Sequence, residues 1–349
     1  MSSNPRYLAY VLKVPRNIVL RKMLVPSPID QFNFEVTRRC NGHCFYCNIW
    51  KEHIENGSEI SPQDLKRGLR PYRLFRKVRS IGLTGGEPIL RTDLLEVISE
   101  LHEICPRARF GLVTNGLLPE RFLKMVQEAS KLLKNPVAVG ISLDGFSHTD
   151  CIQRGNPKHS ELAWKTYNLL KENGIAAGFE STLTKLNIGE MAAFREGLLS
   201  VGSSHAFVIA ATSEHYYHNE DNKGFMPLDG SDVEAVEDLK KIGAGAIFNY
   251  YLPSYLKKPR QIFPCFSGLT SFFLNSKGLV YPCIHLNRSL GSLLENSFGS
   301  LWYSDRAKEI RREIVSGKCH CWTACEADNT IRNLMYPAIL MRLRYAPAH

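Results

Sequence analysis

Residues 32–47 read FNFEVTRRCNGHCFYC, and this stretch decides the fold. Its first six letters largely alternate apolar and polar side chains, which is typical of a β-strand. Cys40, Cys44 and Cys47 then follow within eight positions, directly after the strand. Thiolates are soft ligands, so three of them in one loop can converge on a zinc ion or an iron–sulfur cluster. A tetrahedral zinc site would need a fourth ligand, and only His43 lies nearby.

Strands and helices alternate along the chain after this stretch. Near-continuous apolar strands are predicted at 80–84, 109–114, 137–143, 177–184 and 205–211. Segments of helical period are predicted at 91–102, 120–133, 161–173 and 189–199. Buried strands separated by helices imply a parallel sheet with helices on its outer face. We therefore predict an α/β fold in which residues 31–214 form a partial (β/α)6 barrel of the TIM type.

The pattern changes after residue 214. We predict a polar loop at 215–230, a helix at 231–250, a hairpin at 272–283 and a helix at 301–314. The chain thus divides into a barrel and a smaller cysteine-bearing module. We predict a basic amphipathic segment at 1–30, the barrel at 31–214 and a connecting region at 215–264. The cysteine-bearing module follows at 265–328 and a basic apolar tail at 329–349.

Glycines and polar residues gather just after the predicted strands, at the edge where parallel α/β folds bind ligands. The second strand ends in Thr84-Gly85-Gly86-Glu87-Pro88, the third runs into Asn115, and the fourth ends in Ser142-Leu143-Asp144, with Arg154 shortly after. Glycines allow the backbone to approach a ligand closely. A carboxylate such as Glu87 can accept hydrogen bonds from an ammonium, and a guanidinium such as Arg154 can pair bidentately with a carboxylate.

The CxxxCxxC spacing after the first strand, with an aromatic residue before its last cysteine, resembles the radical S-adenosylmethionine (SAM) superfamily. The motif at 84–88 resembles the GGEP motif of that family. The resemblance implies that Cys40, Cys44 and Cys47 hold a catalytic [4Fe-4S] cluster whose open iron binds SAM. Reductive cleavage of SAM would then give a 5′-deoxyadenosyl radical. The resemblance also implies a set of SAM-binding residues: Tyr46, Thr84, Gly85, Gly86, Glu87, Asn115, Ser142, Asp144 and Arg154.

A second group of cysteines lies in the C-terminal module, at Cys265, Cys283, Cys319, Cys321 and Cys325. Their spacing resembles the SPASM and twitch extensions of radical SAM enzymes, which hold auxiliary [4Fe-4S] clusters. Five cysteines resemble the shorter twitch type and imply one auxiliary cluster. We expect Cys265, Cys283, Cys321 and Cys325 as its ligands, with Cys319 spare or replacing Cys321. A structural zinc site is the alternative.

Substrate chemistry is less clearly marked in the sequence. Radical reactions often need an acid–base group or a hydrogen donor. His215 and Tyr216 follow the sixth predicted strand at the ligand-binding edge, and we predict that they are catalytic. Cys105 and Cys151 stand apart from both cysteine groups, and we expect them to be packed thiols.

The chain of 349 residues has a net charge of +10, concentrated in 1–29, 65–79 and 331–349. Such charge is typical of solvated surface or of a face for an anionic partner. No apolar run reaches the roughly 18 residues that span a bilayer, and the N-terminus does not resemble a signal peptide. We expect a cytoplasmic protein, with peripheral binding at a membrane surface as an alternative.

We predict a small-molecule or lipid-linked substrate, with sugar-containing molecules among the candidates. We also predict an electron donor such as flavodoxin or ferredoxin. Maturation of a ribosomal peptide is an alternative, ranked lower because no leader-binding domain is expected before the barrel. A non-catalytic zinc and nucleic-acid-binding protein is an alternative of another class. It would explain the cysteines and the charge but not residues 84–88, so nucleic acid is not favoured as a partner.

Overall fold

The computed structural model describes residues 15–55, 58–222, 226–241, 247–319, 321–323, 326–327, 329–330 and 333. Within these residues the strands form one sheet in the order β6-β5-β4-β3-β2-β1-β7-β8-β9. The strands are β1 (Gln31–Thr37), β2 (Ser80–Gly85), β3 (Arg109–Thr114), β4 (Ala138–Ser142), β5 (Ala177–Leu183), β6 (Ser204–Ile209), β7 (Ser271–Leu274), β8 (Leu279–Tyr281) and β9 (Gly291–Ser292).

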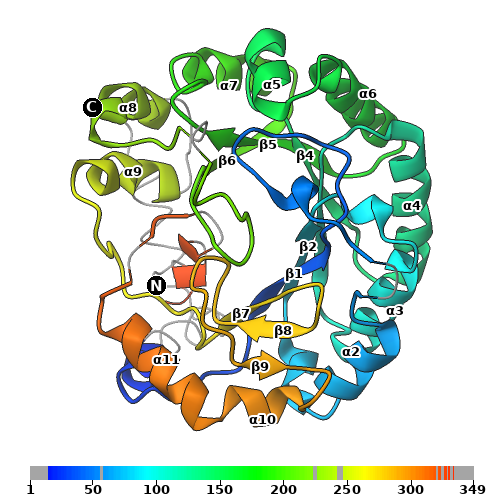
Figure 1. Ribbon diagram of the computed structural model, residues 1–349. Coiled ribbons are helices and arrows are strands. Elements are labelled where there is room, and N and C mark those ends of the chain that lie inside the picture. The colour runs from blue at the N-terminus through cyan, green and yellow to red at the C-terminus, as the bar shows by residue number, and fades with distance from the viewer. Residues whose placement is uncertain are drawn as a thin grey trace, which may run out of the picture.

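Strands β1 to β6 are parallel neighbours in sequence order, and helices surround them on the outside (Figure 1). The helices of this ring are α2 (Pro62–Leu69), α3 (Leu94–Ile104), α4 (Pro119–Leu132), α5 (Ser147–Arg154), α6 (His159–Glu172) and α7 (Met191–Ser200). The predicted partial (β/α)6 barrel is confirmed. The predicted strands are found to within one or two residues at each end.

The C-terminal region extends the barrel sheet beyond β1. Strand β7 pairs with β1 in parallel, with Phe32 opposite Phe272, and the two rings stack with centroids 4.6 Å apart. Strands β8 and β9 then continue antiparallel. The predicted hairpin therefore exists, but its first strand hydrogen-bonds to the barrel. Phe75 and Phe298 pack around the same aromatic pair, so barrel and C-terminal region share one apolar core.

Two of the predicted helices are interrupted. The prediction at 231–250 covers parts of α8 (Val233–Lys241) and α9 (Ile247–Lys257), and residues 242–246 lie outside the described part. The prediction at 301–314 covers parts of α10 (Phe298–Trp302) and α11 (Asp305–Val315). Ser304 separates α10 from α11, because its hydroxyl accepts a hydrogen bond from Ala307 N at 3.1 Å and so caps a new helix.

The described part of the N-terminal segment is helical at 15–22 and packs on the C-terminal region. Asn17 donates to Asn333 at 2.8 Å, and Arg21 donates to the carbonyl of Cys265 at 2.9 Å. Residues 1–14 and the tail from 334 lie outside the described residues, so the amphipathic pattern predicted there is not described. Among the described residues, no helix has both the length and the hydropathy that a membrane-spanning segment requires.

Candidate active site at the carboxyl ends of the barrel strands

The predicted cluster cysteines lie in the loop after β1. Cys40, Cys44 and Cys47 all line one cavity at the carboxyl ends of the barrel strands, with a volume of about 220 Å³. The loop is held by hydrogen bonds from distant elements. Phe45 N donates to Gln153 O in α5 at 3.1 Å, and Asn219 donates to Tyr46 O at 2.8 Å. These contacts turn the three thiols toward a common space.

Most of the predicted SAM-binding residues line the same cavity. The residues that do so are Tyr46, Thr84, Gly85, Gly86, Asn115, Ser142 and Arg154, and Tyr216, predicted as catalytic, lines the cavity with them. Glu87, Asp144 and His215 do not line it. The loops after four successive strands therefore contribute predicted residues to one site, as the parallel topology requires.

Two glycines let the motif after β2 lie directly against the start of the cysteine loop. Gly85 has a φ of +147°, and a Cβ there would lie 2.1 Å from the carbonyl oxygen of Thr37. A Cβ on Gly86 would lie 2.2 Å from the carbonyl oxygen of Arg39. No larger residue fits at either position without a backbone shift. The close approach is secured by Gly86 N, which donates to Thr37 O at 2.8 Å.

Glu87 is buried beneath the cavity and joins β2 to β3. Its carboxylate accepts hydrogen bonds from Asn115 N at 2.7 Å and from the Thr114 hydroxyl at 3.0 Å. Burial raises its pKa to about 7, although these hydrogen bonds act to lower it. The contact of Glu87 with the SAM ammonium stays a prediction. In the structure, Glu87 fixes the backbone at Asn115, which does line the cavity.

Arg154 and Asp144 form a buried ion pair beside the cysteine loop. The guanidinium contacts the carboxylate twice, Nε to Oδ2 at 2.6 Å and Nη2 to Oδ1 at 2.7 Å. Its Nη1 lies 3.9 Å from Cys44 Sγ, and the guanidinium stacks over the Tyr46 ring at 5.6 Å. Burial acts to lower the pKa of Arg154, but Asp144, Tyr46 and Cys44 together raise it well above its ordinary value. A permanent positive charge therefore lies next to a cluster cysteine.

His215 and Tyr216, predicted as catalytic, occupy different places. Tyr216 is buried and lines the cavity, with its hydroxyl 3.1 Å from the Thr84 hydroxyl. His215 stacks on Tyr281 with ring centroids 4.3 Å apart, on the side of the C-terminal region. Burial lowers the pKa of His215 to about 4, so the ring is neutral at pH 7. A catalytic role for either residue stays a prediction.

Sequence reasoning missed two cavity residues on β5, Glu180 and Thr182. Burial raises the pKa of Glu180, and Arg154 partly offsets this effect. One feature of the sequence could have identified Glu180: it is the only charged side chain in the strand AGFESTL. Apolar lining comes from Leu83, Val113 and Val208 on neighbouring strands.

The donor set fits an iron–sulfur cluster better than a single zinc ion. Ligands of one tetrahedral zinc ion lie within about 4 Å of one another. Within the described ranges, no three His, Cys, Asp or Glu side chains are grouped for a single ion. His43, the candidate fourth zinc ligand, is exposed and packs its ring against Trp50 at 4.8 Å. Three thiols beside a cavity instead leave room for a larger group and its ligand.

The C-terminal cysteines gather around a buried carboxylate. Burial, followed by the charges of Glu326 and Cys319, raises the pKa of Cys265 to about 11. Cys283 and Cys321 have pKa values well above the ordinary value, from burial first and then from the charges of Glu326 and Cys265. Three of the four expected auxiliary ligands are thus neighbours, and Cys319 lies beside them. Cys325 lies outside the described residues. Glu326 was not anticipated.

A partial barrel with a three-cysteine loop and a cysteine-rich C-terminal region is typical of a class of iron–sulfur proteins. Comparison with known proteins identifies that class. Residues 34–195 match the sequence model of the radical SAM superfamily, and residues 265–326 match that of an iron–sulfur cluster-binding domain, SPASM. The chain belongs to the radical SAM superfamily and carries a C-terminal SPASM domain. These domains imply a [4Fe-4S] cluster, SAM and auxiliary iron–sulfur binding.

Curated relatives match about half of the chain. The chain is 31% identical over 178 residues to the Fe-coproporphyrin III synthase of Methanosarcina barkeri, which covers 48% of this chain and 43% of that protein. It is 34% identical over 165 residues to a probable GTP 3′,8-cyclase of Methanococcus maripaludis, which covers 47% of this chain and 50% of the cyclase. The chain thus spans about half the length of these relatives.

Solved structures extend the similarity of fold to nearly the whole chain. The structure of anSMEcpe with bound AdoMet and the Cp18Cys peptide has a TM-score of 0.62 and 16% sequence identity, and covers 91% of this chain and 99% of that chain. At this identity the likeness concerns the fold. It agrees with a SPASM domain that packs directly on the barrel.

Proposed function

We propose that the protein is a radical SAM enzyme that abstracts a hydrogen atom from a small-molecule substrate. One observation carries this proposal: Cys40, Cys44 and Cys47 line the same cavity as the Gly85–Gly86 backbone and Arg154. Thiols that can hold a cluster, a backbone that can bind the amino-acid part of SAM and a guanidinium that can pair with its carboxylate therefore face one cavity. The proposal concerns the activity of the whole protein, whereas these curated relatives match about half of the chain.

The two bound groups supply the chemistry. When bound and reduced, the cluster supplies the electron that splits SAM into methionine and a 5′-deoxyadenosyl radical, which takes a hydrogen atom from the substrate. Cys40, Cys44 and Cys47 would hold the cluster as thiolates. Their pKa values are high without it, because burial raises those of Cys40 and Cys47 to about 12. Metal binding would therefore release protons from these thiols.

The protein's own residues would orient and isolate the reacting groups. Asp144 holds Arg154 in one orientation because it also accepts hydrogen bonds from Thr182 N at 2.7 Å and the Tyr46 hydroxyl at 3.2 Å. The fixed guanidinium offsets negative charge at the thiolates. Glu180, on β5, brings a carboxylate to the same cavity, where it can bind a hydroxyl or ammonium group. The apolar side chains of the cavity exclude water that would quench a radical.

The C-terminal cysteines would hold one auxiliary cluster. Cys265, Cys283 and Cys321 are the proposed common ligands, and the fourth is Cys319 or Cys325. When bound, this cluster would supply a one-electron acceptor for an oxidation of the substrate. A soluble electron donor such as flavodoxin or ferredoxin would reduce the catalytic cluster.

The substrate class rests on weaker grounds. The names of both curated relatives denote small molecules, a porphyrin and a nucleotide, and this supports a small-molecule substrate. A peptide is the second candidate, because the anSMEcpe structure contains a bound peptide beside AdoMet. A lipid-linked substrate has no support in these comparisons and depends on the membrane test described in the Discussion.

Anaerobic turnover tests the proposal. The reconstituted protein should be brown, bind about eight irons, and form 5′-deoxyadenosine from SAM when reduced. Deuterated small-molecule extracts and deuterated peptides, supplied separately, should then show which class transfers deuterium to 5′-deoxyadenosine. A Cys40→Ala variant serves as the control. A colourless protein that binds zinc and leaves SAM intact would contradict the proposal.

A further inference from the structure

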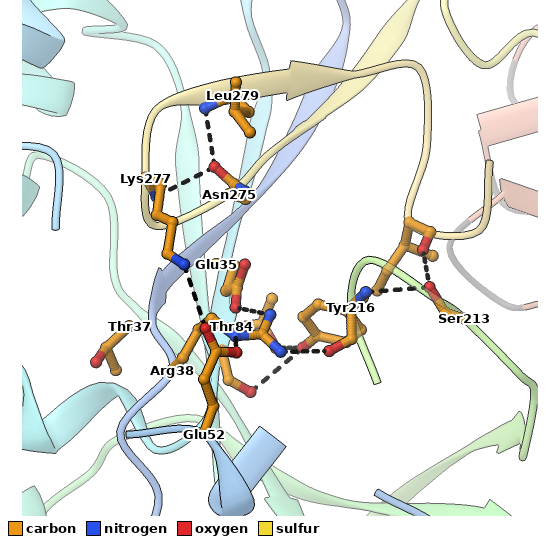
Figure 2. Close-up of polar contacts among 12 residues, drawn as sticks. Glu35, Thr37, Arg38, Glu52, Thr84, Ser213, Tyr216, Asn275, Lys277 and Leu279 are labelled. Carbon is orange, nitrogen blue, oxygen red and sulfur yellow. Dashed lines mark hydrogen bonds and ion pairs between the residues drawn. The ribbon is translucent and has the colours of Figure 1, made fainter. Parts of the chain in front are cut away.

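Arg38 connects three parts of the molecule next to the cysteine loop (Figure 2). It follows β1 and is only 4% exposed. Its Nη1 donates to Glu35 on β1 at 2.7 Å, its Nε to the Glu52 carboxylate, and its Nη2 to the backbone carbonyl of Tyr216 at 2.9 Å. The planar fork of a guanidinium can serve three acceptors at once, which the point charge of a lysine cannot.

Tyr216 links Arg38 to the cavity. Its ring is buried against Phe273, with centroids 5.3 Å apart, and its hydroxyl reaches over the end of β2. There the hydroxyl lies 3.1 Å from the Thr84 hydroxyl and donates to the carbonyl oxygen of Gly85 at 3.3 Å. Both residues belong to the motif that lines the cavity. Tyr216 thus contacts the backbone that would face SAM.

The SPASM domain holds the other side of the same loop. Ser213 donates its hydroxyl to Ile284 O at 2.9 Å and accepts from Tyr216 N at 3.3 Å. Lys277, in the turn between β7 and β8, contacts Glu52 at 3.2 Å, and Asn275 orders that turn through Lys277 N at 3.1 Å. In Figure 2 these contacts run from the β7–β8 turn through Glu52 and Arg38 to Tyr216.

We propose that Tyr216 and Arg38 are positioning residues through which the SPASM domain sets the shape of the SAM-binding motif at Thr84–Gly85. Arg38 fixes the backbone of Tyr216, and Tyr216 fixes the Gly85 carbonyl. The Gly85–Gly86 peptide donates through Gly86 N to Thr37 O at 2.8 Å and accepts from Tyr216 at the Gly85 carbonyl, so both hydrogen bonds hold its orientation. The inference rests on the proposed function, because it assigns this motif to SAM.

SAM affinity measures the effect directly. Tyr216→Phe keeps the packed ring and removes the hydroxyl, so the holoenzyme should bind SAM about 2- to 12-fold more weakly, the equivalent of one hydrogen bond. Arg38→Lys keeps the charge but not the three-way fork. Its effect should not add to that of Tyr216→Phe in the double variant, because both act through the same contact.

A matched control lies elsewhere on the boundary between barrel and SPASM domain. The hydroxyl of Tyr303, between α10 and α11, lies 3.0 Å from that of Tyr72 in the barrel. Tyr303→Phe therefore removes a phenol hydrogen bond across the same boundary, away from the cavity. It should leave SAM affinity unchanged.

The experiment uses anaerobically reconstituted holoenzyme, with equilibrium dialysis of labelled SAM and the SAM-dependent change in the electron paramagnetic resonance spectrum of the reduced cluster. Iron content and thermal unfolding show whether each variant is intact. Wild-type protein that holds its cluster but binds no SAM would overturn the proposed function. Wild-type binding with equal affinity in Tyr216→Phe, or equal weakening in Tyr303→Phe, would overturn this inference alone. If Arg38→Lys fails to fold, Tyr216→Phe decides.

Discussion

The cysteines of this chain differ in function according to what surrounds each thiol. Cys40, Cys44 and Cys47 line a cavity, whereas Cys151 donates its thiol to Pro157 O at 3.3 Å and Cys105 is fully buried in the apolar core. Both isolated cysteines lie apart from the cavity, Cys105 as the packed thiol expected from the sequence and Cys151 as a half-buried thiol that is less enclosed than expected. They therefore provide internal controls for substitutions in the cluster loop.

Replacing Cys40 with alanine should abolish formation of 5′-deoxyadenosine and lower iron content by about one cluster, because a site-differentiated cubane needs all three thiolates. Anaerobic iron analysis and chromatography of the SAM products measure both effects. Cys151→Ala should retain both properties. Retained SAM cleavage in a triple Cys40, Cys44 and Cys47 alanine variant would contradict the assignment.

Glu87→Gln should weaken SAM binding by about 10- to 150-fold, the equivalent of losing a charge-assisted hydrogen bond, while iron content stays normal. The structure adds a second reason for the loss. Both Asn115 N and the Thr114 hydroxyl donate to this carboxylate, and an amide nitrogen in place of one oxygen would face a donor. Equilibrium dialysis with SAM provides the measurement, and unchanged affinity would place the cofactor elsewhere.

At the scale of elements, β5 and β6 are joined by a partly buried histidine that must stay neutral. Burial, followed by the charge of Arg195, lowers the pKa of His205 to about 3. The ring Nε2 lies 2.7 Å from Ser181 Oγ across the two strands. Ser181 also donates its hydroxyl to Leu143 O, so the ring donates to Ser181.

The stability of the protein should therefore fall as pH decreases from about 6.5 toward 3. In that window the unfolded chain binds a proton at His205 and the folded protein does not, so acid favours unfolding. The free energy of unfolding should drop by about 1 kcal/mol at pH 5.5. His205→Gln keeps a donor toward Ser181 and should remove this contribution, as denaturant titrations of both proteins at pH 7.5 and 5.5 would measure. Identical pH dependence in both would contradict it.

The order of the elements could be predicted from the sequence because it depends on local patterns. The strands are apolar runs, and the rim residues follow them directly, so topology alone brings Cys40, Gly85, Asn115 and Ser142 to one edge. Glu180 also lines the cavity, but it belongs to no family motif, so the neighbouring sequence did not mark it as a site residue.

Contacts between distant segments could not be predicted in this way. The hydroxyls of Thr84 and Tyr216 are 132 positions apart in the chain. Asp144 was expected to contact SAM, yet it is enclosed by Arg154, Tyr46 and Thr182. Side-chain partners of this kind depend on packing geometry, and no spacing in the sequence encodes it. The pairing of β7 with β1 was missed for the same reason.

At the scale of the whole molecule, the two iron–sulfur sites should separate in function. Cys283→Ala should lower iron content by about one cluster and stop product formation while SAM cleavage survives, because Cys283 belongs to the SPASM domain and not to the barrel cavity. Iron analysis, 5′-deoxyadenosine and product are measured in parallel. Full iron with full product would remove the auxiliary site from the mechanism.

The excess positive charge is partly compensated inside the folded chain. Lys66 contacts Glu100 at 2.9 Å and Arg67 contacts Asp64 at 2.7 Å, so the basic run at 65–79 includes ion-paired surface. The N-terminal helix differs, because Arg16 and Lys22 are exposed next to Val19, which is 53% exposed. A membrane surface is therefore tested best at this helix.

If the membrane prediction is right, the protein should co-sediment with anionic vesicles and less so as salt rises. Each basic residue near an anionic surface contributes about 1 kcal/mol. An Arg16→Gln and Lys22→Gln double variant should therefore bind markedly more weakly, while Arg21 and Asn17 keep the helix attached to the SPASM domain. Equal pelleting with neutral and anionic vesicles, or none with either, would contradict the prediction and the lipid-linked substrate with it.

The pairing of β1 with β7 also has a consequence for synthesis on the ribosome. Strand β7 begins about 240 residues after β1, so one edge of the strand that leads into the cysteine loop has no partner until late in translation. At 5–20 residues per second that interval lasts on the order of 10 to 50 seconds. An open strand edge is a site for aggregation. The nascent barrel would therefore be a client for chaperones, and the cysteine loop would be accessible for metal insertion before the SPASM domain closes the sheet.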